Sequence, residues 1–124
     1  FKRLAMLPIE VVVRNWAYGS LCKRFPFYQE GARLSRPVVE YFYKSDAAGD
    51  PPLPEAVILE QGWLQEGVTP DRLRLLALEA NAALLATFDA IGIQCADFKL
   101  EMGLDADGAL CLGDELSPDG FRLR

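Results

Sequence analysis

The stretch Leu7-Pro8-Ile9-Glu10-Val11-Val12-Val13-Arg14 decides the fold of this chain. Its β-branched residues favour a β-strand. Val11, Val12 and Val13 are all apolar, although successive strand residues point to opposite faces of a sheet. The stretch therefore predicts a central strand that is covered on both faces. A globular domain rarely opens on a central strand, so we expect a further segment before it.

More strands are expected farther along the chain. Residues 38–43 and 93–101 are rich in β-forming residues, and residues 109–114 predict a strand that returns beside the second of these. Asp105-Ala106-Asp107-Gly108 predicts a hairpin turn between them, because the later glutamate and the spacing of a calcium-binding loop are absent. Residues 115–124 are expected to form a loop.

Two helices are expected, a short one over residues 54–61 and a long one over residues 70–90. Thr69 fits the N-cap of the long helix, and Gly92 lies just past its end. An apolar stripe of helical period is expected to pack on the core. It consists of Leu73, Leu76, Ala80, Leu84, Phe88 and Ile91. The sequence therefore predicts one α+β domain over residues 1–124, an antiparallel sheet with one long packing helix.

Composition narrows the chemistry. The 124 residues suffice for one domain with a core, and a net charge of −5 argues against nucleic-acid binding. We expect neither a membrane span nor a signal peptide, and the expected compartment is the cytoplasm. Histidine is absent, which excludes Ser-His-Asp and Cys-His catalysis. The cysteines Cys22, Cys95 and Cys111 are widely spaced, which argues against a zinc site and a disulfide framework.

The predicted strand 93–101 carries a charged row. Asp97, Lys99 and Glu101 alternate with apolar residues and therefore share one face. The returning strand ends in Asp114-Glu115, which a tight hairpin would bring near this row. Two interpretations fit equally: a site for magnesium and a nucleotide phosphate, or the solvated face of an antiparallel pair.

The segment from Arg14 to Ser20 also has two interpretations. A guanidinium and a hydroxyl before a helical turn could bind an anion. Alternatively, Arg14 is a surface residue and Ser20 caps a short helical segment that follows it. Asp46 and Asp50 stand in a turn-rich loop, where aspartate is most often a turn former, and Arg122 has no local explanation.

Several stretches resemble the SAICAR synthetase family. Residues 6–20 (MLPIEVVVRNWAYGS) resemble its first signature, and residues 95–103 (CADFKLEMG) resemble its second. Residues 36–46 and 49–51 are similar to further family stretches, and residues 114–119 followed by Arg122-Leu123 are similar to a later acidic motif. These matches occur in the family's order over nearly the whole chain.

The resemblance implies the larger lobe of a two-lobed ATP-binding fold, broadly like ATP-grasp enzymes and kinases. It also implies an ATP- and Mg2+-dependent ligase of de novo purine biosynthesis. That enzyme joins L-aspartate to carboxyaminoimidazole ribotide (CAIR) through an acyl phosphate and gives SAICAR, ADP and phosphate. The expected partners are these small molecules and a second copy of the chain, with no nucleic acid and no membrane. Two alternatives stay open: a non-catalytic binding or structural remnant, and a small-molecule kinase.

Matched residue by residue, the resemblance implies a role for each site position. Lys99 and Asp97 would serve catalysis, and Glu101 and Asp114 would bind magnesium and the ATP phosphates. The ribotide phosphate would be held by Arg14, Ser20 and Arg122. The rest of the ribotide and aspartate pocket would be lined by Glu10, Lys44, Asp46, Asp50 and Asp119.

The chain also departs from the family. Tyr18 stands where a small residue or threonine is usual, and we expect it to crowd the phosphate-binding turn. Met102, Gly120, Phe121 and Arg124 are further departures. The family's chains extend farther at both ends, with a β-rich nucleotide-covering lobe in front and a helical end behind. We therefore expect little or no ligase activity from the 124 residues alone, measured as succinocarboxamide formation.

Overall fold

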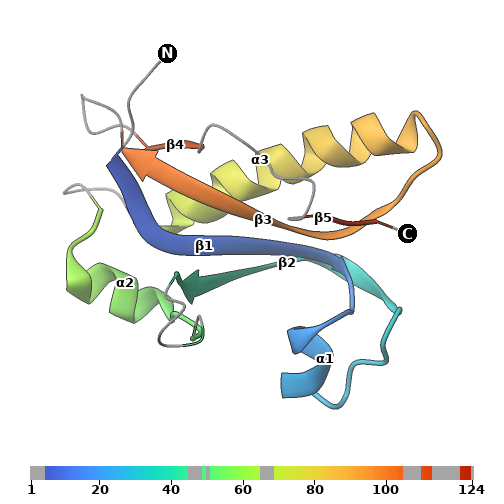
Figure 1. The fold of residues 1–124 in the computed structure, drawn as a ribbon, viewed down its shortest axis with the longest axis horizontal. Helices are drawn as coiled ribbons and strands as arrows, with labels where there is room; N and C mark the ends of the chain where they lie inside the picture. The colour runs from blue at the N-terminus through green and yellow to red at the C-terminus, as the bar shows by residue number, and fades with distance from the viewer. Residues whose placement is uncertain are drawn as a thin grey trace.

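The computed structural model describes residues 5–44, 49, 51–64, 69–104, 110–112 and 121–123. Its elements follow the chain in the order β1 (Ala5–Trp16), α1 (Ser20–Arg24), β2 (Arg33–Tyr43), α2 (Glu55–Gln61), α3 (Pro70–Asp89), β3 (Cys95–Leu104), β4 (Leu110–Leu112) and β5 (Phe121–Leu123). The predicted α+β class is confirmed: an antiparallel sheet packs against one long helix (Figure 1). Among the helices that the structure describes, none is long and apolar enough to cross a membrane.

β1 is a central strand, as its valines predict. It pairs antiparallel with β2 on one side and with β3 on the other. β4 and β5 both pair with the far edge of β3, β4 near the C-terminal end of β3 and β5 near its N-terminal end. Val11 and Val13 are fully buried and Val12 is 4% exposed, so both faces of β1 are covered.

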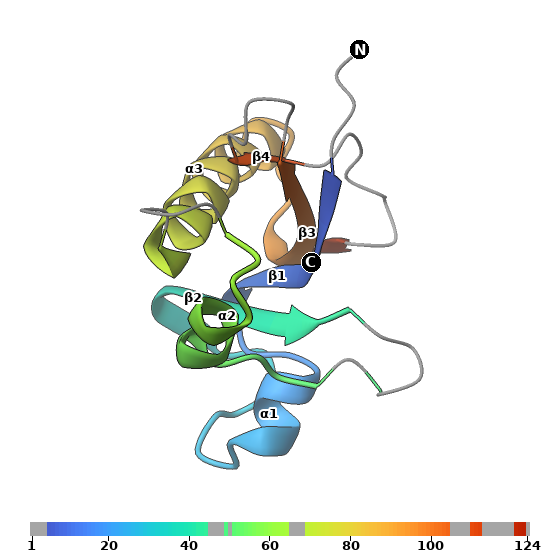
Figure 2. The ribbon, with the colours of Figure 1, turned by 90° about the vertical axis from the view of Figure 1, so that its left-hand side faces the viewer.

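The core lies between the sheet and α3, which covers one face of the sheet (Figure 2). Leu73 and Ala77 of the helix are fully buried one turn apart. Apolar side chains of β1 and β3 pack in the same core: Leu7, Ile9, Val11, Val13, Phe98, Leu100 and Met102. The predicted stripe is confirmed by the partly buried Leu76, Ala80, Leu84 and Phe88. It is wrong at Ile91, which is 65% exposed because the helix ends at Asp89 and the chain turns.

Two local expectations are corrected. Residues 115–124, expected to be a loop, contain β5, which is too short for an alternating pattern to show in the sequence. Ser20, considered as an N-cap, is the first residue of α1. Gly19 occupies the N-cap position with a φ of 63°, a left-handed conformation that glycine adopts at little cost. The predicted turn at residues 105–108 lies outside the described residues.

Candidate active site

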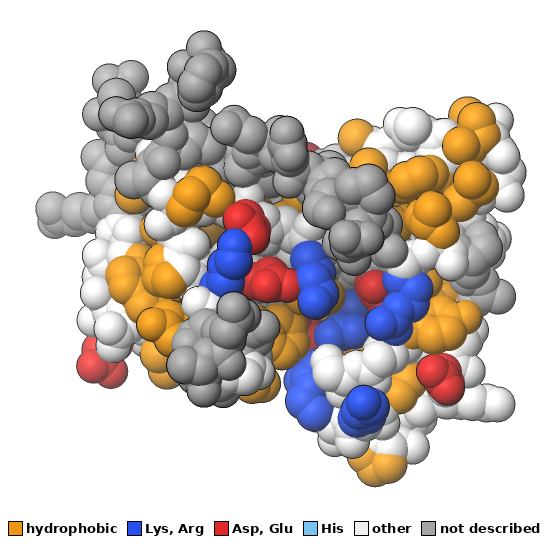
Figure 3. Space-filling view, in the orientation of Figure 1, with side chains coloured by type: hydrophobic (Ala, Val, Ile, Leu, Met, Phe, Trp, Pro, Cys, Tyr) orange, Lys and Arg blue, Asp and Glu red, His pale blue; other side chains and the backbone are white. Residues whose placement is uncertain are grey.

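The sheet face opposite α3 carries charged side chains on neighbouring strands, and we call it the charged face. The register aligns three cross-strand rows on it: Phe42–Glu10–Glu101, Glu40–Val12–Lys99 and Val38–Arg14–Asp97–Arg122. Figure 3 shows basic and acidic side chains together in a band across the middle of this face. Its described basic residues are Arg14, Arg24, Lys44, Lys99 and Arg122, and its acidic ones are Glu10, Glu40, Asp97 and Glu101. The band is therefore not acidic, although the chain as a whole is.

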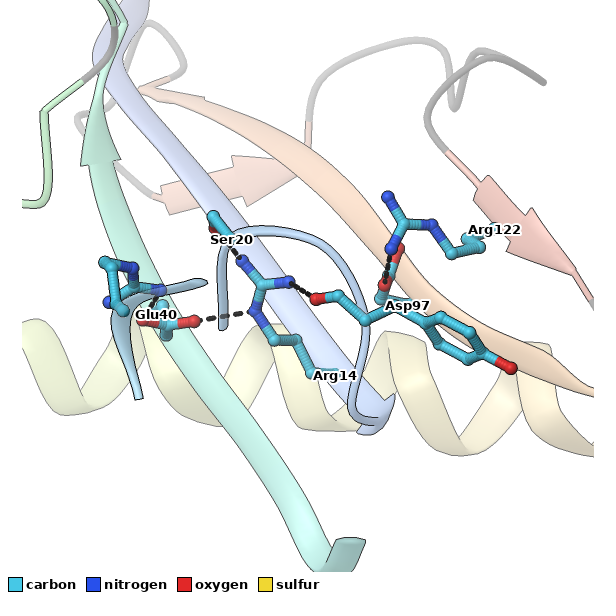
Figure 4. Close-up of polar contacts among 7 residues, drawn as sticks. Arg14, Ser20, Glu40, Asp97 and Arg122 are labelled. Carbon is cyan, nitrogen blue, oxygen red and sulfur yellow. Dashed lines mark hydrogen bonds and ion pairs between the residues drawn. The ribbon is translucent and has the colours of Figure 1, made fainter. Parts of the chain in front are cut away.

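Arg14 is the most enclosed of these cations, with a side chain 6% exposed (Figure 4). Its Nε donates to Glu40 Oε1 at 2.6 Å. Its Nη1 donates to the Tyr18 carbonyl at 3.1 Å, and its Nη2 donates to Ser20 Oγ at 2.9 Å. The guanidinium thus joins β1 to β2 and to the turn before α1. Because Ser20 Oγ accepts this bond, its hydroxyl hydrogen is left to donate to another acceptor.

Glu40, which no sequence motif singled out, is shared by two arginines. Its Oε1 accepts from Arg14, and its Oε2 accepts from Arg24 Nη2 at 2.6 Å. The Arg24 guanidinium also lies 5.5 Å from the centre of the Phe42 ring. A signal for this role exists in the sequence, since Glu40 is the one charged residue in the apolar run 38–43.

Asp97 is 8% exposed and lies against Arg122, with 3.5 Å between Asp97 Oδ2 and Arg122 Nη1 (Figure 4). This oxygen is buried and has no hydrogen-bond partner among the described residues. The contact is therefore an ion pair without a well-formed hydrogen bond. Burial raises the pKa of the Asp97 carboxyl, and the positive charges of Arg122, Arg14 and Lys99 oppose the rise.

Two exposed lysines make ion pairs on the charged face. Lys99 Nζ is 3.4 Å from Glu10 Oε1, and Lys44 Nζ pairs with Glu101 Oε1. The side chains of Lys99 and Lys44 are 61% and 49% exposed. The Lys44–Glu101 pair is exposed on both sides and contributes about 0–1 kcal/mol, and the Lys99–Glu10 contact is too long for a well-formed hydrogen bond. Both ammonium groups can therefore exchange their carboxylates for a ligand at little cost.

A cavity of about 190 Å³ opens on the charged face. It is lined by Glu10, Val12, Arg14, Ser20, Phe42 and Lys99. Cationic and hydroxyl groups from β1, α1 and β3 meet there above two apolar side chains, an arrangement that suits a small anionic group. Larger cavities of about 390 and 410 Å³ lie beside Trp16 and Arg33, away from the predicted site residues.

The structure brings together these predicted site residues: Lys99, Asp97, Arg14, Ser20, Glu10, Lys44, Arg122 and Glu101. Four further predicted site residues lie outside the described residues: Asp46, Asp50, Asp114 and Asp119. Gly120 and Arg124 lie outside them as well. Within the part of the chain that the structure describes, no group of three or more acidic, cysteine or histidine side chains could hold a metal ion. The roles of the individual residues stay predictions.

The SAICAR synthetase family profile matches residues 1–124, the whole chain. Among curated relatives, the phosphoribosylaminoimidazole-succinocarboxamide synthase of Methanocaldococcus jannaschii is 44% identical over 122 residues, which are 98% of this chain and 50% of the relative. The chain thus spans about half the length of the curated relatives it matches.

Solved structures agree with the sequence comparison. A SAICAR synthetase in complex with ADP is 40% identical, with a TM-score of 0.88 over 98% of this chain and 51% of that chain. The phosphoribosylaminoimidazole-succinocarboxamide synthase from Ehrlichia chaffeensis is 39% identical, with a TM-score of 0.89 over 98% of this chain and 52% of that chain. Sequence and fold together show that the chain belongs to the SAICAR synthetase family.

Proposed function

We propose that this chain forms the ribotide-binding and magnesium-nucleotide-binding side of an ATP-dependent ligase of purine biosynthesis. In the proposed reaction, a carboxylate oxygen of CAIR takes the γ-phosphoryl group of ATP, and ADP leaves. The amine of L-aspartate then attacks the acyl carbon and displaces phosphate, which gives SAICAR. Because the chain spans about half of its relatives' length, the activity is proposed for a complete enzyme that contains this half.

The observation that carries the proposal is the charged face. Its basic and acidic side chains lie on neighbouring strands on the side that α3 leaves open, and three of them, Glu10, Arg14 and Lys99, line a cavity there. Phosphoryl transfer needs mainly positioning and neutralisation of negative charge, so a site without histidine can perform it.

The ribotide phosphate is assigned to Arg122, Ser20 and Arg14. Arg122 is half-exposed and presents a planar fork of donors that matches phosphate oxygens. Ser20 has a hydroxyl hydrogen to donate, because its oxygen already accepts from Arg14. Arg14 is nearly buried and would act chiefly by fixing Ser20 and the turn before α1, while its charge attracts the anion.

Lys99 is assigned to the transferring phosphoryl group. Its side chain is exposed beside the cavity, and among the described residues its ammonium pairs with Glu10 alone, at 3.4 Å. A mobile positive charge there would neutralise charge that develops on the phosphoryl oxygens. Asp97, two residues before Lys99 on β3, is assigned to catalysis with it, and its ion pair with Arg122 links it to the residues assigned to the ribotide phosphate. Glu10, Lys44, Asp46, Asp50 and Asp119 would line the ribotide and aspartate pocket.

The donor set on the charged face fits magnesium. Glu101 is 45% exposed by its side chain and stands directly across from Glu10, and carboxylate oxygens are the ligands that Mg2+ prefers. Mg2+ usually takes only one or two carboxylates and keeps water and phosphate oxygens as its other ligands. Glu101 and Asp114 would hold the ion, which when bound neutralises charge on the nucleotide phosphates.

Calorimetric titration of the purified chain with CAIR and with Mg-ATP tests the proposal. We expect both to bind, and we expect Lys99→Met to weaken the binding of Mg-ATP. Lys23→Met, on the exposed side of α1, is the matched control and should bind like the wild type. Binding of neither ligand would favour a non-catalytic remnant of the fold and would contradict the proposal.

A second measurement separates the ligase from a small-molecule kinase of the same fold. On the complete enzyme with CAIR and Mg-ATP, we expect steady release of ADP only when L-aspartate is added. ADP release that proceeds at the same rate without L-aspartate would favour the kinase.

A further inference from the structure

Tyr18 lies in the turn before α1 and contacts two arginines of the charged face. Its carbonyl accepts from Arg14 Nη1 at 3.1 Å. Its ring lies under the Arg122 guanidinium, with 5.5 Å between Cζ and the ring centre. The face of a tyrosine ring attracts a guanidinium electrostatically and offers it a flat surface. One residue therefore touches an arginine of β1 through its backbone and an arginine of β5 through its side chain.

We propose that Tyr18 is a positioning residue that holds the Arg122 guanidinium at the phosphate end of the site, in a fixed relation to Arg14. The phosphate as ligand rests on the proposed function, whereas the positioning is a property of the free chain. Tyr18 was expected to crowd the phosphate-binding turn. Among the described residues, Tyr18 does not line the cavity, and its ring lies against Arg122.

Arg122 needs such support because its other contacts are weak. It belongs to the short strand β5, and its side chain is 45% exposed. Its ion pair with Asp97 spans 3.5 Å, and the Asp97 oxygen of that pair has no hydrogen-bond partner among the described residues. A contact of this length forms no well-aligned hydrogen bond, so it fixes the orientation of the half-exposed guanidinium only weakly. A second contact on the flat face of the guanidinium is what limits its orientation.

Gly19 also lies against the Arg122 guanidinium. A Cβ at Gly19 would lie 3.0 Å from Arg122 Nη1 and 3.1 Å from Nη2, tighter than most Cβ contacts, so the guanidinium would have to shift. The guanidinium therefore rests against the bare backbone of the residue that follows Tyr18. The φ of 63° at Gly19 also sets the turn that places Tyr18 and Ser20 on their respective partners.

Tyr18 is itself fixed by the turn around it. The Gly31 N–H donates to the Ala17 carbonyl at 2.7 Å, and the Ala17 N–H donates to the Ala32 carbonyl at 2.8 Å. A Cβ at Gly31 would lie 3.5 Å from the Tyr18 hydroxyl oxygen, which places the tip of the ring beside this pairing. The ring therefore has support from the backbone and can restrain Arg122.

The first test uses the ligand-free chain and the NMR signal of the Arg122 Nε–Hε group. We expect a ring-current displacement of this signal in the wild type and in Tyr18→Phe, which keeps the ring. In Tyr18→Leu the signal should move to the position of an exposed arginine. A wild-type signal without displacement, or an unchanged displacement in Tyr18→Leu, would overturn the proposal. If Tyr18→Leu does not fold, the wild-type spectrum still tests the proposal, because the Arg122 signal must be displaced there.

The second test is titration with ribose 5-phosphate. We expect binding about three- to tenfold weaker in Tyr18→Leu, and within about twofold of wild type in Tyr18→Phe. Tyr28→Leu is the matched control, because the Tyr28 ring packs against Phe27, 4.8 Å between ring centres, and not against Arg122. Unchanged affinity in Tyr18→Leu would overturn the proposal. If the wild type does not bind ribose 5-phosphate but the Arg122 signal still responds to Tyr18, the positioning holds and the phosphate role fails.

Discussion

Among the described carboxylates of the charged face, Glu40 is the one that accepts hydrogen bonds from two arginines. It accepts from Arg14 and Arg24, each at 2.6 Å, and its side chain is 16% exposed. Charge-assisted bonds in such a setting are about twice as strong as neutral ones. Without this carboxylate, the nearly buried Arg14 would lose the only direct ion pair that it makes with the described residues, which is costly in a poorly solvated site.

Glu40→Gln is therefore expected to lower the free energy of unfolding by about 2–4 kcal/mol, measured by urea denaturation. Glu60→Gln, at an exposed position of α2, is the control and should change it by less than about 0.5 kcal/mol. Equal effects of the two substitutions would show that the hydrogen bonds of Glu40 to Arg14 and Arg24 do not stabilise the fold.

Asp97 should give the chain a characteristic pH dependence. Burial raises the pKa of its carboxyl, so the folded chain binds this proton more tightly than the unfolded chain does. The contribution of Asp97 to stability is then largest at low pH and falls as the pH rises above about 4. Asp97→Asn cannot titrate, so its stability relative to wild type should rise between about pH 4 and pH 7. Urea unfolding at several pH values measures this, and a constant difference would contradict it.

At the level of elements, a buried amide pair fastens α3 to the sheet. Asn15 Nδ2 donates to Asn81 Oδ1 at 2.9 Å, and Asn81 Nδ2 donates back to Asn15 Oδ1 at 3.0 Å. Asn15 Nδ2 also donates to the Cys95 carbonyl at 3.2 Å. β1, α3 and β3 thus meet at one polar point, and both amides are nearly buried.

Asn81→Ala tests whether this amide pair stabilises the fold, because the substitution has two opposite effects on the free energy of unfolding. Helix propensity alone would stabilise α3 by up to about 0.7 kcal/mol. The loss of Asn81 leaves the nearly buried Asn15 Oδ1 without its donor at a cost of about 1–3 kcal/mol, so we expect a net loss of stability in urea unfolding. Glu79→Ala, exposed on the same helix, should be nearly neutral. A stabilised Asn81→Ala would mean that the amide pair adds nothing.

The elements differ in how far local sequence predicts them. β1 is long and rich in β-branched residues on both faces, and α3 is long with an apolar stripe of helical period, so the existence of both follows from the sequence. Thr69 lies at the N-cap of α3, as expected. β5 was missed because its formation depends on pairing with β3 and not on its own residues. Gly19 took the N-cap of α1 because the turn needs a left-handed residue there.

At the scale of the whole molecule, the core and the charged face are the two sides of one sheet. The reactivity of the Cys95 thiol in β3 can be used to measure whether the sheet and α3 stay packed together. The Cys95 side chain is fully buried, and burial, with a smaller effect of Asp97, raises the pKa of its thiol to about 11. Only the thiolate reacts readily with alkylating reagents. Cys95 should therefore become reactive only when the sheet and α3 separate.

Alkylation of the native chain near pH 8, followed by peptide mass spectrometry, checks this. We expect Cys22, which is partly exposed, to react much faster than Cys95. In concentrated urea the two cysteines should react at similar rates. Similar rates in the native chain would contradict the buried position of β3.

The sequence by itself determined the central strand, the long helix, the side of β3 that bears Asp97, Lys99 and Glu101, and the motifs of the family. These follow from periodicity and residue type, which are local. Only the tertiary structure decided the neighbours: Glu40 beside Arg14, and Arg122 between Asp97 and Tyr18. Those contacts join residues far apart in the chain, and strand register, which no local pattern records, brings them together.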